Sequence, residues 1–210
     1  MRNIAIIGTA GRYGCMRGRT DKDFLIMLEH AYTLVEDPLG DVHLYSGGAA
    51  WADQLAVELY MQGIVKHLTL FLPAPITYQN RFWEGGNINK PGDGRTANYY
   101  HMLFTQAAYN QTDGLNQSLF SVQRISDAGI KGANLQVNKN GFWARNSQVA
   151  EHADDTLIAY TWGKTGRPTD GSTLDTWHKN HAHNKIHVNL FDLLPALSKQ
   201  EQIFNFSQKI

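Results

Sequence analysis

The 210-residue chain has a single cysteine, Cys15, and no excess charge of either sign. One cysteine excludes a disulfide within the chain and favours a reducing compartment. Lys plus Arg and Asp plus Glu both number 19, so no global field attracts DNA, RNA or an anionic membrane. We therefore expect no nucleic-acid partner and no membrane partner, and any anion site has to be local.

Long apolar stretches are also missing. No segment approaches the roughly 20 apolar residues that cross a bilayer. The apolar run at residues 4–7 is too short for the core of a signal peptide. These absences predict a cytoplasmic protein, and the length suits one domain spanning residues 1–210.

Five short apolar runs are typical of buried parallel strands, which are apolar along their whole length. They cover residues 4–7, 42–45, 68–72, 156–160 and 186–190. Apolar residues at helical spacing fall between them at 23–36, 51–62, 146–153 and 173–181, and a C-terminal helix is expected over 190–207. This alternation predicts an α/β fold with an open parallel sheet flanked by helices.

The segment at about 75–140, after the third strand, interrupts this pattern. It is rich in Asn, Gly, Gln and aromatic residues, and one helix is expected within it at 97–109. A structureless loop of this length is rare in a compact domain, so we interpret the segment as an insertion. The interpretations that remain open are a lid over the strand ends, and a surface excursion or an oligomer contact.

Three glycine-bearing segments each follow a predicted strand. GTAGRYG at 8–14 follows the first, SGGAAWADQ at 46–54 the second, and PTDGST at 168–173 the fourth. Glycine lets the backbone turn tightly and approach a ligand, and free N–H groups at helix starts bind anions. Because the carboxyl ends of parallel strands share one edge of the sheet, we expect one ligand site there.

The predicted ligand-binding residues of these segments are Gly8, Thr9, Gly11, Arg12, Ser46, Gly47, Gly48, Gly171, Ser172 and Thr173. The first glycine spacing is not GxGxxG, and no ribose-binding acid follows the second strand, which disfavours a dinucleotide dehydrogenase. We predict no cofactor.

Four stretches carry a family resemblance: IAIIGTAGR at 4–12, SGGAAWADQLAVE at 46–58, ARNSQVAEHADDTLIAYTWG at 144–163 and DGSTLDTW at 170–177. Together they resemble the SLOG superfamily of Rossmann-like proteins, which includes the Lonely Guy phosphoribohydrolases. The resemblance implies a nucleotide-type ligand between the glycine loops, faced by Arg145 and Asn146, with its phosphate on residues 171–173. It also implies a homo-oligomer, because many members of the superfamily pair as dimers.

The chain departs from the phosphoribohydrolases of this superfamily at one motif. They carry PGGxGTxxE where this chain has DGSTLDTW, so Asp175 stands near the position of the acid. The second glycine motif is closer to the GGAxGAD pattern of uncharacterised branches. The insertion has no counterpart in the resemblance.

The resulting prediction is a protein that binds a nucleotide or nucleotide-derived ligand and hydrolyses its N-glycosidic bond. Hydrolysis needs a carboxylate to stabilise the ribose cation or to activate water, and the candidates are Asp175, Asp53 and Glu58. Structural alternatives stay open: Asp53 suits a helix N-terminus, Glu58 a solvated helix face, and Arg145 a surface ion pair. The alternative functions are nucleotide binding or sensing without turnover, and a structural domain that contacts partners.

Four histidines, at positions 178, 181, 183 and 187, lie close together in the sequence. The first two are three residues apart on a predicted helix, but a zinc site needs a third ligand, and no cysteine is near. We predict no metal site and interpret these side chains as solvated or stacked.

Overall fold

The computed structural model describes residues 1–36, 41–85, 92–109, 119–138, 140–163, 166–169 and 171–196. This part of the chain forms one six-stranded sheet from β1 (Arg2–Gly8), β2 (Val42–Ser46), β3 (His67–Leu72), β4 (Asn134–Val137), β5 (Thr156–Thr161) and β6 (Asn184–Asn189). Every neighbouring pair is parallel, and the order across the sheet is β4-β3-β2-β1-β5-β6. The predicted fold class, a Rossmann-like open parallel sheet, is confirmed.

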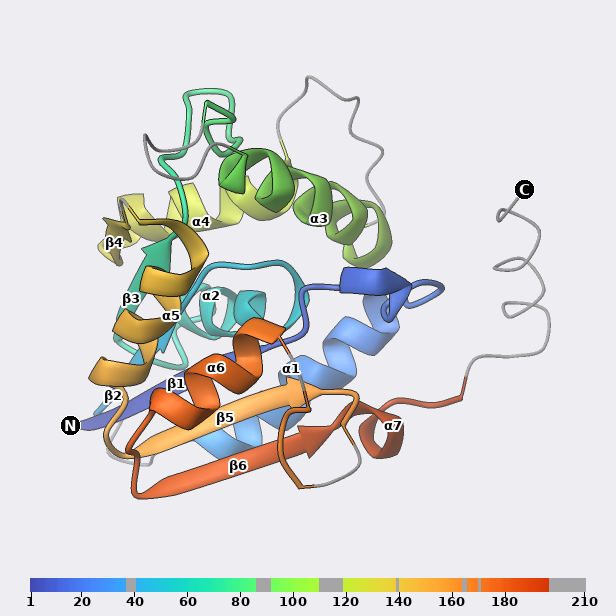
Figure 1. The fold of residues 1–210 in the computed structure, drawn as a ribbon, viewed down its shortest axis with the longest axis vertical. Coiled ribbons are helices and arrows are strands. Elements are labelled where there is room, and N and C mark those ends of the chain that lie inside the picture. The colour runs from blue at the N-terminus through green and yellow to red at the C-terminus, as the bar shows by residue number, and fades with distance from the viewer. Residues whose placement is uncertain are drawn as a thin grey trace.

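The apolar strands result from burial on both faces of the sheet. Ile4 and Ile6 of β1 pack into one core cluster, while Ala5 and Ile7 pack into a second cluster on the opposite face. The first face is covered by α1 (Asp21–Val35) and α2 (Gln54–Met61), and the second by α5 (Gly141–His152) and α6 (Gly171–Lys179) (Figure 1). Side chains alternate between faces along a strand, so a strand buried on both faces reads as a continuous apolar run.

The remaining helices extend this two-sided arrangement. Helix α3 (Asp93–Ala108) packs on α1, and α4 (Phe120–Lys131) packs on α2; the two contact each other at the top of Figure 1. The short helix α7 (Leu190–Leu193) follows β6, and two single 3₁₀ turns, η1 (Arg12–Gly14) and η2 (Trp51–Asp53), follow β1 and β2. No helix in the described ranges is both long enough and apolar enough to cross a membrane.

The connection order creates a switch point beside β1. From β1 the chain builds outward through β2, β3 and β4, and then returns to the opposite side of β1 as β5. Gly8, the last residue of β1, is in register with Tyr160 of β5. In open α/β sheets the crevice at such a point, beyond the carboxyl ends of the strands, is where ligands bind.

Two elements within residues 75–140 were not predicted, α4 and the edge strand β4. Helix α4 carries buried Val122, Ile125 and Ala128 at three-residue spacing. Strand β4 pairs with β3, so the 75–140 segment is also the crossover that completes one edge of the sheet. The expected helix at 97–109 is present as α3. Of the expected C-terminal helix, residues 190–193 form α7, and residues 197–207 lie outside the described part of the chain.

We predict that Gly8→Ala lowers the free energy of unfolding by about 3 kcal/mol, because a Cβ there collides with the Tyr160 carbonyl and lies 2.7 Å from Ala52 Cβ. The matched control is Gly63→Ala. Its φ is +78° and no atom lies within 4 Å of the added Cβ, so it carries only left-handed strain of about 1 kcal/mol. Urea unfolding measures the free energy of unfolding of both variants. Equal losses in Gly8→Ala and Gly63→Ala would contradict the close approach at Gly8.

Candidate functional site

Three loops are joined to one another at the end of β1. The Thr9 N–H donates to the Tyr160 carbonyl at 2.9 Å, and the Thr9 carbonyl accepts from the Ala52 N–H at 3.2 Å. The Thr173 hydroxyl donates to the Gly8 carbonyl at 3.0 Å. The three glycine-bearing segments therefore meet at the carboxyl edge of the sheet, as expected from their positions after strands.

A pocket of about 400 Å³ lies where these loops meet. Its size is within the range of small-molecule sites. Of the predicted binding residues, the pocket is lined by Gly8, Thr9, Arg12, Gly48, Arg145, Gly171, Ser172 and Thr173. No Asp or Glu occurs among the described residues that line it, whereas two arginines do.

Gly11, Ser46, Gly47 and Asn146 lie behind this lining. Ser46 is buried and its hydroxyl donates to the Ile6 carbonyl at 2.7 Å, which fixes the end of β2 against β1. Gly11 has a φ of +84°, and a Cβ there would lie 3.3 Å from the Trp51 ring. Gly47 and Asn146 line a small hollow of about 10 Å³ that shares Gly8, Arg145, Ser172 and Thr173 with the pocket.

Arg145 is the most deeply buried cation of the site, with 7% of its surface exposed. It donates to the Gly47 carbonyl at 3.1 Å and to Asn146 Oδ1 at 3.2 Å, and its Nε has no acceptor. No carboxylate among the described residues lies within ion-pair distance of it. Burial lowers the pKa of Arg145, but a guanidinium stays protonated at neutral pH. The sequence alternative of a surface ion pair is therefore wrong.

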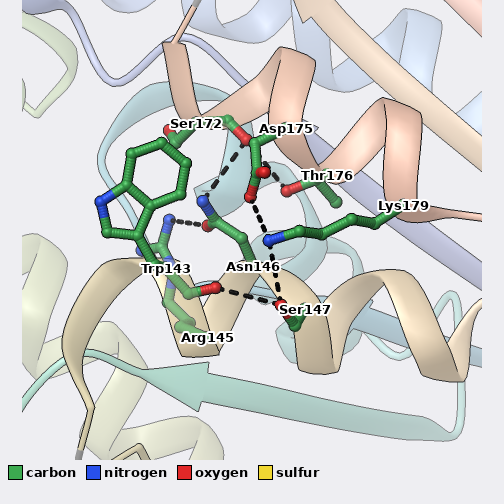
Figure 2. Close-up of polar contacts among 8 residues, drawn as sticks. All are labelled: Trp143, Arg145, Asn146, Ser147, Ser172, Asp175, Thr176 and Lys179. Atoms are coloured by element: carbon green, nitrogen blue, oxygen red, sulfur yellow. Dashed lines mark hydrogen bonds and ion pairs between the residues drawn. The ribbon is translucent and has the colours of Figure 1, made fainter.

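Asn146 links this guanidinium to the N-terminus of α6. Its Nδ2 donates to the Ser172 carbonyl at 3.4 Å, while its Oδ1 accepts from Arg145 (Figure 2). The α6 N-terminus contributes Gly171, Ser172 and Thr173 to the pocket. The first N–H groups of a helix have no partner within the helix and attract negative charge, so this end of the pocket is electropositive.

Asp53 organises the glycine loops from behind the pocket. It is 3% exposed, and its Oδ2 accepts the Ala49 N–H at 3.1 Å. Burial raises the pKa of Asp53, while Arg145 and hydrogen bonds from the backbone of Ala49, Gly47 and Gly8 oppose that rise. Both glycine loops therefore donate to one carboxylate. A Cβ on Gly47 would lie 2.7 Å from the Arg145 guanidinium carbon and 2.9 Å from Asp53, so a side chain there would displace one of these two groups.

The other two predicted acids are ion-paired and do not line the pocket. Glu58 is buried, and Arg124 of α4 binds both its oxygens, at 2.9 and 2.6 Å, while the Tyr109 hydroxyl donates to it at 2.9 Å. The expectation of a solvated face fails because α4 covers this face of α2. Asp175 pairs with Lys179 at 2.8 Å, and Lys179 also donates to Ser147 of α5 (Figure 2).

Aromatic side chains that sequence reasoning missed form much of the pocket wall. Tyr100 of α3, Phe142 of α5 and Trp162 after β5 all line it. The Arg12 guanidinium lies 5.8 Å from the Tyr100 ring and 5.7 Å from the Phe142 ring, and Arg145 lies 5.2 Å from the latter. Arg12 and Arg145 thus both lie near the Phe142 ring. Cation–π contacts of this kind position the two guanidinium groups at the pocket wall without neutralising their charge.

Trp51 shapes the second loop from the interior. It is a non-glycine residue with a φ of +59°, in the left-handed region that bulky side chains avoid. Its ring is 2% exposed and lies against Phe104 of α3 and Phe24 of α1, with ring centroids 4.9 and 6.4 Å away.

His101 of α3 lines the pocket and is buried, with both ring nitrogens bonded. Nε2 lies 3.0 Å from the Gly48 carbonyl and Nδ1 lies 2.9 Å from the Ser121 hydroxyl. Burial lowers the pKa of His101 to about 4, and the charge of Arg145 contributes to the shift. No sequence motif marked this residue.

The predicted histidine group is dispersed around β6. His187 bonds to the Thr161 hydroxyl at 2.8 Å, whereas His178, His181 and His183 are exposed. Within the described ranges, no three His, Cys, Asp or Glu side chains are grouped closely enough to hold a metal ion.

The fold and pocket define a Rossmann-like α/β protein with a cationic, aromatic-walled pocket at its switch point. The chain is 32% identical over 193 residues to an uncharacterized protein of Acanthamoeba polyphaga mimivirus, covering 89% of this chain and 95% of the viral protein. It belongs to one family with that protein. No protein-family model and no solved structure matches the chain.

We predict that Glu58→Gln lowers the free energy of unfolding by about 2 kcal/mol, because it weakens a buried, doubly bonded ion pair. The same carboxylate-to-amide change at Asp175 should cost less than about 1 kcal/mol, since Lys179 is 41% exposed and water screens the pair. Urea unfolding compares the two variants. A larger loss for Asp175→Asn would contradict the assigned environments.

We predict that His101 makes stability depend on pH. Its pKa falls from 6.5 to about 4 on folding, so the neutral ring contributes stability that is present above pH 6.5 and is lost as pH falls toward 4. Between pH 7.5 and 4.5 the wild type should lose about 2.5 kcal/mol more than His101→Gln, which has no imidazole to titrate. Urea unfolding at the two pH values measures these losses. Equal losses in the wild type and His101→Gln would show that a group other than His101 takes up the proton.

Proposed function

We propose that the chain binds a nucleotide or nucleotide-derived ligand in the pocket at the switch point, as a member of the SLOG superfamily. Arg145 is the observation that carries the proposal. Its guanidinium is buried and makes no ion pair with the described carboxylates. The charge of Asp53 offsets the cost of burial only in part, because the pKa of Arg145 stays lowered, and an anionic ligand would supply further compensation. A phosphate is the anion that suits this position, because an arginine and a helix N-terminus both favour it.

The remaining lining supports a ligand with both an anionic and a flat apolar part. Arg12 brings a second positive charge to the wall, and Tyr100, Phe142 and Trp162 offer aromatic surface. Aromatic rings stack on nucleobases irrespective of their identity. This combination favours a nucleotide over inorganic phosphate or a free base.

Binding without turnover is the better supported form of this proposal. Asp53 accepts backbone N–H groups of both glycine loops, and Glu58 and Asp175 are held by Arg124 and Lys179. A carboxylate engaged in this way is less able to act on a ribose. A protein that captures or senses a nucleotide needs no such acid.

Hydrolysis of an N-glycosidic bond is the second candidate, and one observation favours it. The hollow of about 10 Å³ beside the pocket is lined by Asp53. A space of roughly this size holds a single water molecule. Asp53 could activate a water there toward a ligand in the pocket, with which the hollow shares Gly8 and Arg145.

The homo-oligomer expected from the resemblance is part of the same proposal and is tested by sedimentation.

The test of binding is calorimetric titration of the protein with AMP and with ADP, with adenosine and inorganic phosphate as partial ligands. We predict that Arg12→Gln weakens binding of the preferred nucleotide about tenfold to a hundredfold, the range expected for loss of a charge-assisted contact. The matched control is Arg95→Gln. The Arg95 side chain is 77% exposed and does not line the pocket. The Arg95→Gln variant should therefore bind the nucleotide with the affinity of the wild type.

Failure of AMP and ADP to bind would overturn the nucleotide proposal and favour a structural or partner-binding domain. Equal affinity of Arg12→Gln and Arg95→Gln would remove Arg12 from the site. Chromatography of the same mixtures separates the two candidates, since release of free adenine and ribose phosphate requires hydrolysis. Binding without these products supports capture or sensing.

A further inference from the structure

The peptide between Gly48 and Ala49 is held from both sides. Its carbonyl accepts a hydrogen bond from His101 Nε2 at 3.0 Å, and its N–H donates to Asp53 Oδ2 at 3.1 Å. Gly48, Ala49 and His101 all line the pocket. The orientation of a wall-forming peptide therefore depends on one side chain from α2's entry turn and one from α3.

The hydrogen bonds determine the tautomer of His101. A carbonyl only accepts, so Nε2 carries the proton and Nδ1 is left to accept from the Ser121 hydroxyl at 2.9 Å. Ser121 in turn lies 2.9 Å from the Thr105 hydroxyl, which completes the chain as a donor. His101, Ser121 and Thr105 are each 1% exposed or less, so water does not compete for these bonds.

The backbone at Gly48 needs this external support. Its φ of +63° is in the left-handed region, and a Cβ would lie 2.7 Å from Leu72 Cδ2, so a side chain there would strain the backbone and displace Leu72. Glycine also has the greatest conformational freedom of any residue. With no side chain of its own to pack, the loop is fixed by the groups that bond to its peptide.

We infer that His101 is a positioning residue of the pocket, and that through it α3 fixes the second glycine loop for ligand binding. This inference rests on the proposed function for its effect on affinity. A loop already held in its bound conformation loses less entropy when the ligand arrives, which strengthens binding. Because Ala97 and Tyr100 of the same helix also line the pocket, α3 is part of the binding scaffold rather than a lid over a finished site.

Two amide substitutions separate the two ring nitrogens of His101. The side-chain amide of glutamine reaches the position of Nε2 and preserves a donor to the Gly48 carbonyl. The amide of asparagine reaches only the position of Nδ1, so it preserves contact with Ser121 and loses Gly48. We expect His101→Asn to weaken ADP binding about tenfold, and His101→Gln to remain within about threefold of the wild type.

The control for a general loss of stability is Asn98→Ala, also in α3. Asn98 is 1% exposed and bonds to the backbone of Phe82 at both its N–H and its carbonyl, without contacting Gly48. The Asn98→Ala substitution should lower the melting temperature at least as much as His101→Asn does, and should change the affinity for ADP less than threefold. An equal loss of ADP affinity in Asn98→Ala and His101→Asn would overturn the inference.

Hydrogen exchange of the Ala49 amide in ligand-free protein tests the same inference without a nucleotide. Exchange should be faster in His101→Asn than in His101→Gln and the wild type, because the freed peptide swings away from Asp53. Equal exchange in all three proteins would overturn the positioning role. If wild-type protein fails to bind ADP but Ala49 exchange follows this order, the proposed function alone is overturned.

Discussion

The hydrogen bonds around Gly8 and Thr9 are the constraint on which the rest of the site depends. Through them the end of β1 bonds to β5, to the turn that opens α2, and to the N-terminus of α6. The loop after β1, the turn that opens α2 and the N-terminus of α6 belong to three different crossovers of the sheet. The close contact of Gly8 with the Tyr160 carbonyl and Ala52 leaves no room for a side chain at this junction. One glycine thereby allows three loops to form one wall.

Much of this architecture follows from local sequence signals. Four of the five predicted strands are buried along most of their length, and glycine-bearing turns follow three of them, so the sheet and the meeting of the loops could be expected. Strand β4 gave no such signal, since it has four residues at the sheet edge and two of them are Asn134 and Gln136. The helical spacing of Val122, Ile125 and Ala128 was present in the sequence and was overlooked.

The side chains of the site were harder to predict than its backbone. Tyr100, Phe142 and Trp162 come from three separate elements, and only the tertiary fold brings them to one wall. Glu58 is buried because α4 covers α2, so the missed helix produced the wrong expectation of solvent exposure. For Asp53, the sequence predicted a helix N-terminus or a catalytic acid. The observed partners, N–H groups from two different loops, require knowledge of how those loops approach each other.

The left-handed backbone at Trp51 couples the packing of the interior to the shape of the pocket wall. A tryptophan in this conformation carries an energetic penalty of about 1–2 kcal/mol, which only a well-packed environment sustains. That environment is the aromatic contact with Phe24 and Phe104, on helices that precede and follow the loop in the chain. Exchanging either ring for a smaller one would release the turn and move Ala50 at the pocket wall. Substitution of these interior aromatics would therefore change the shape of the pocket, although neither ring lines it.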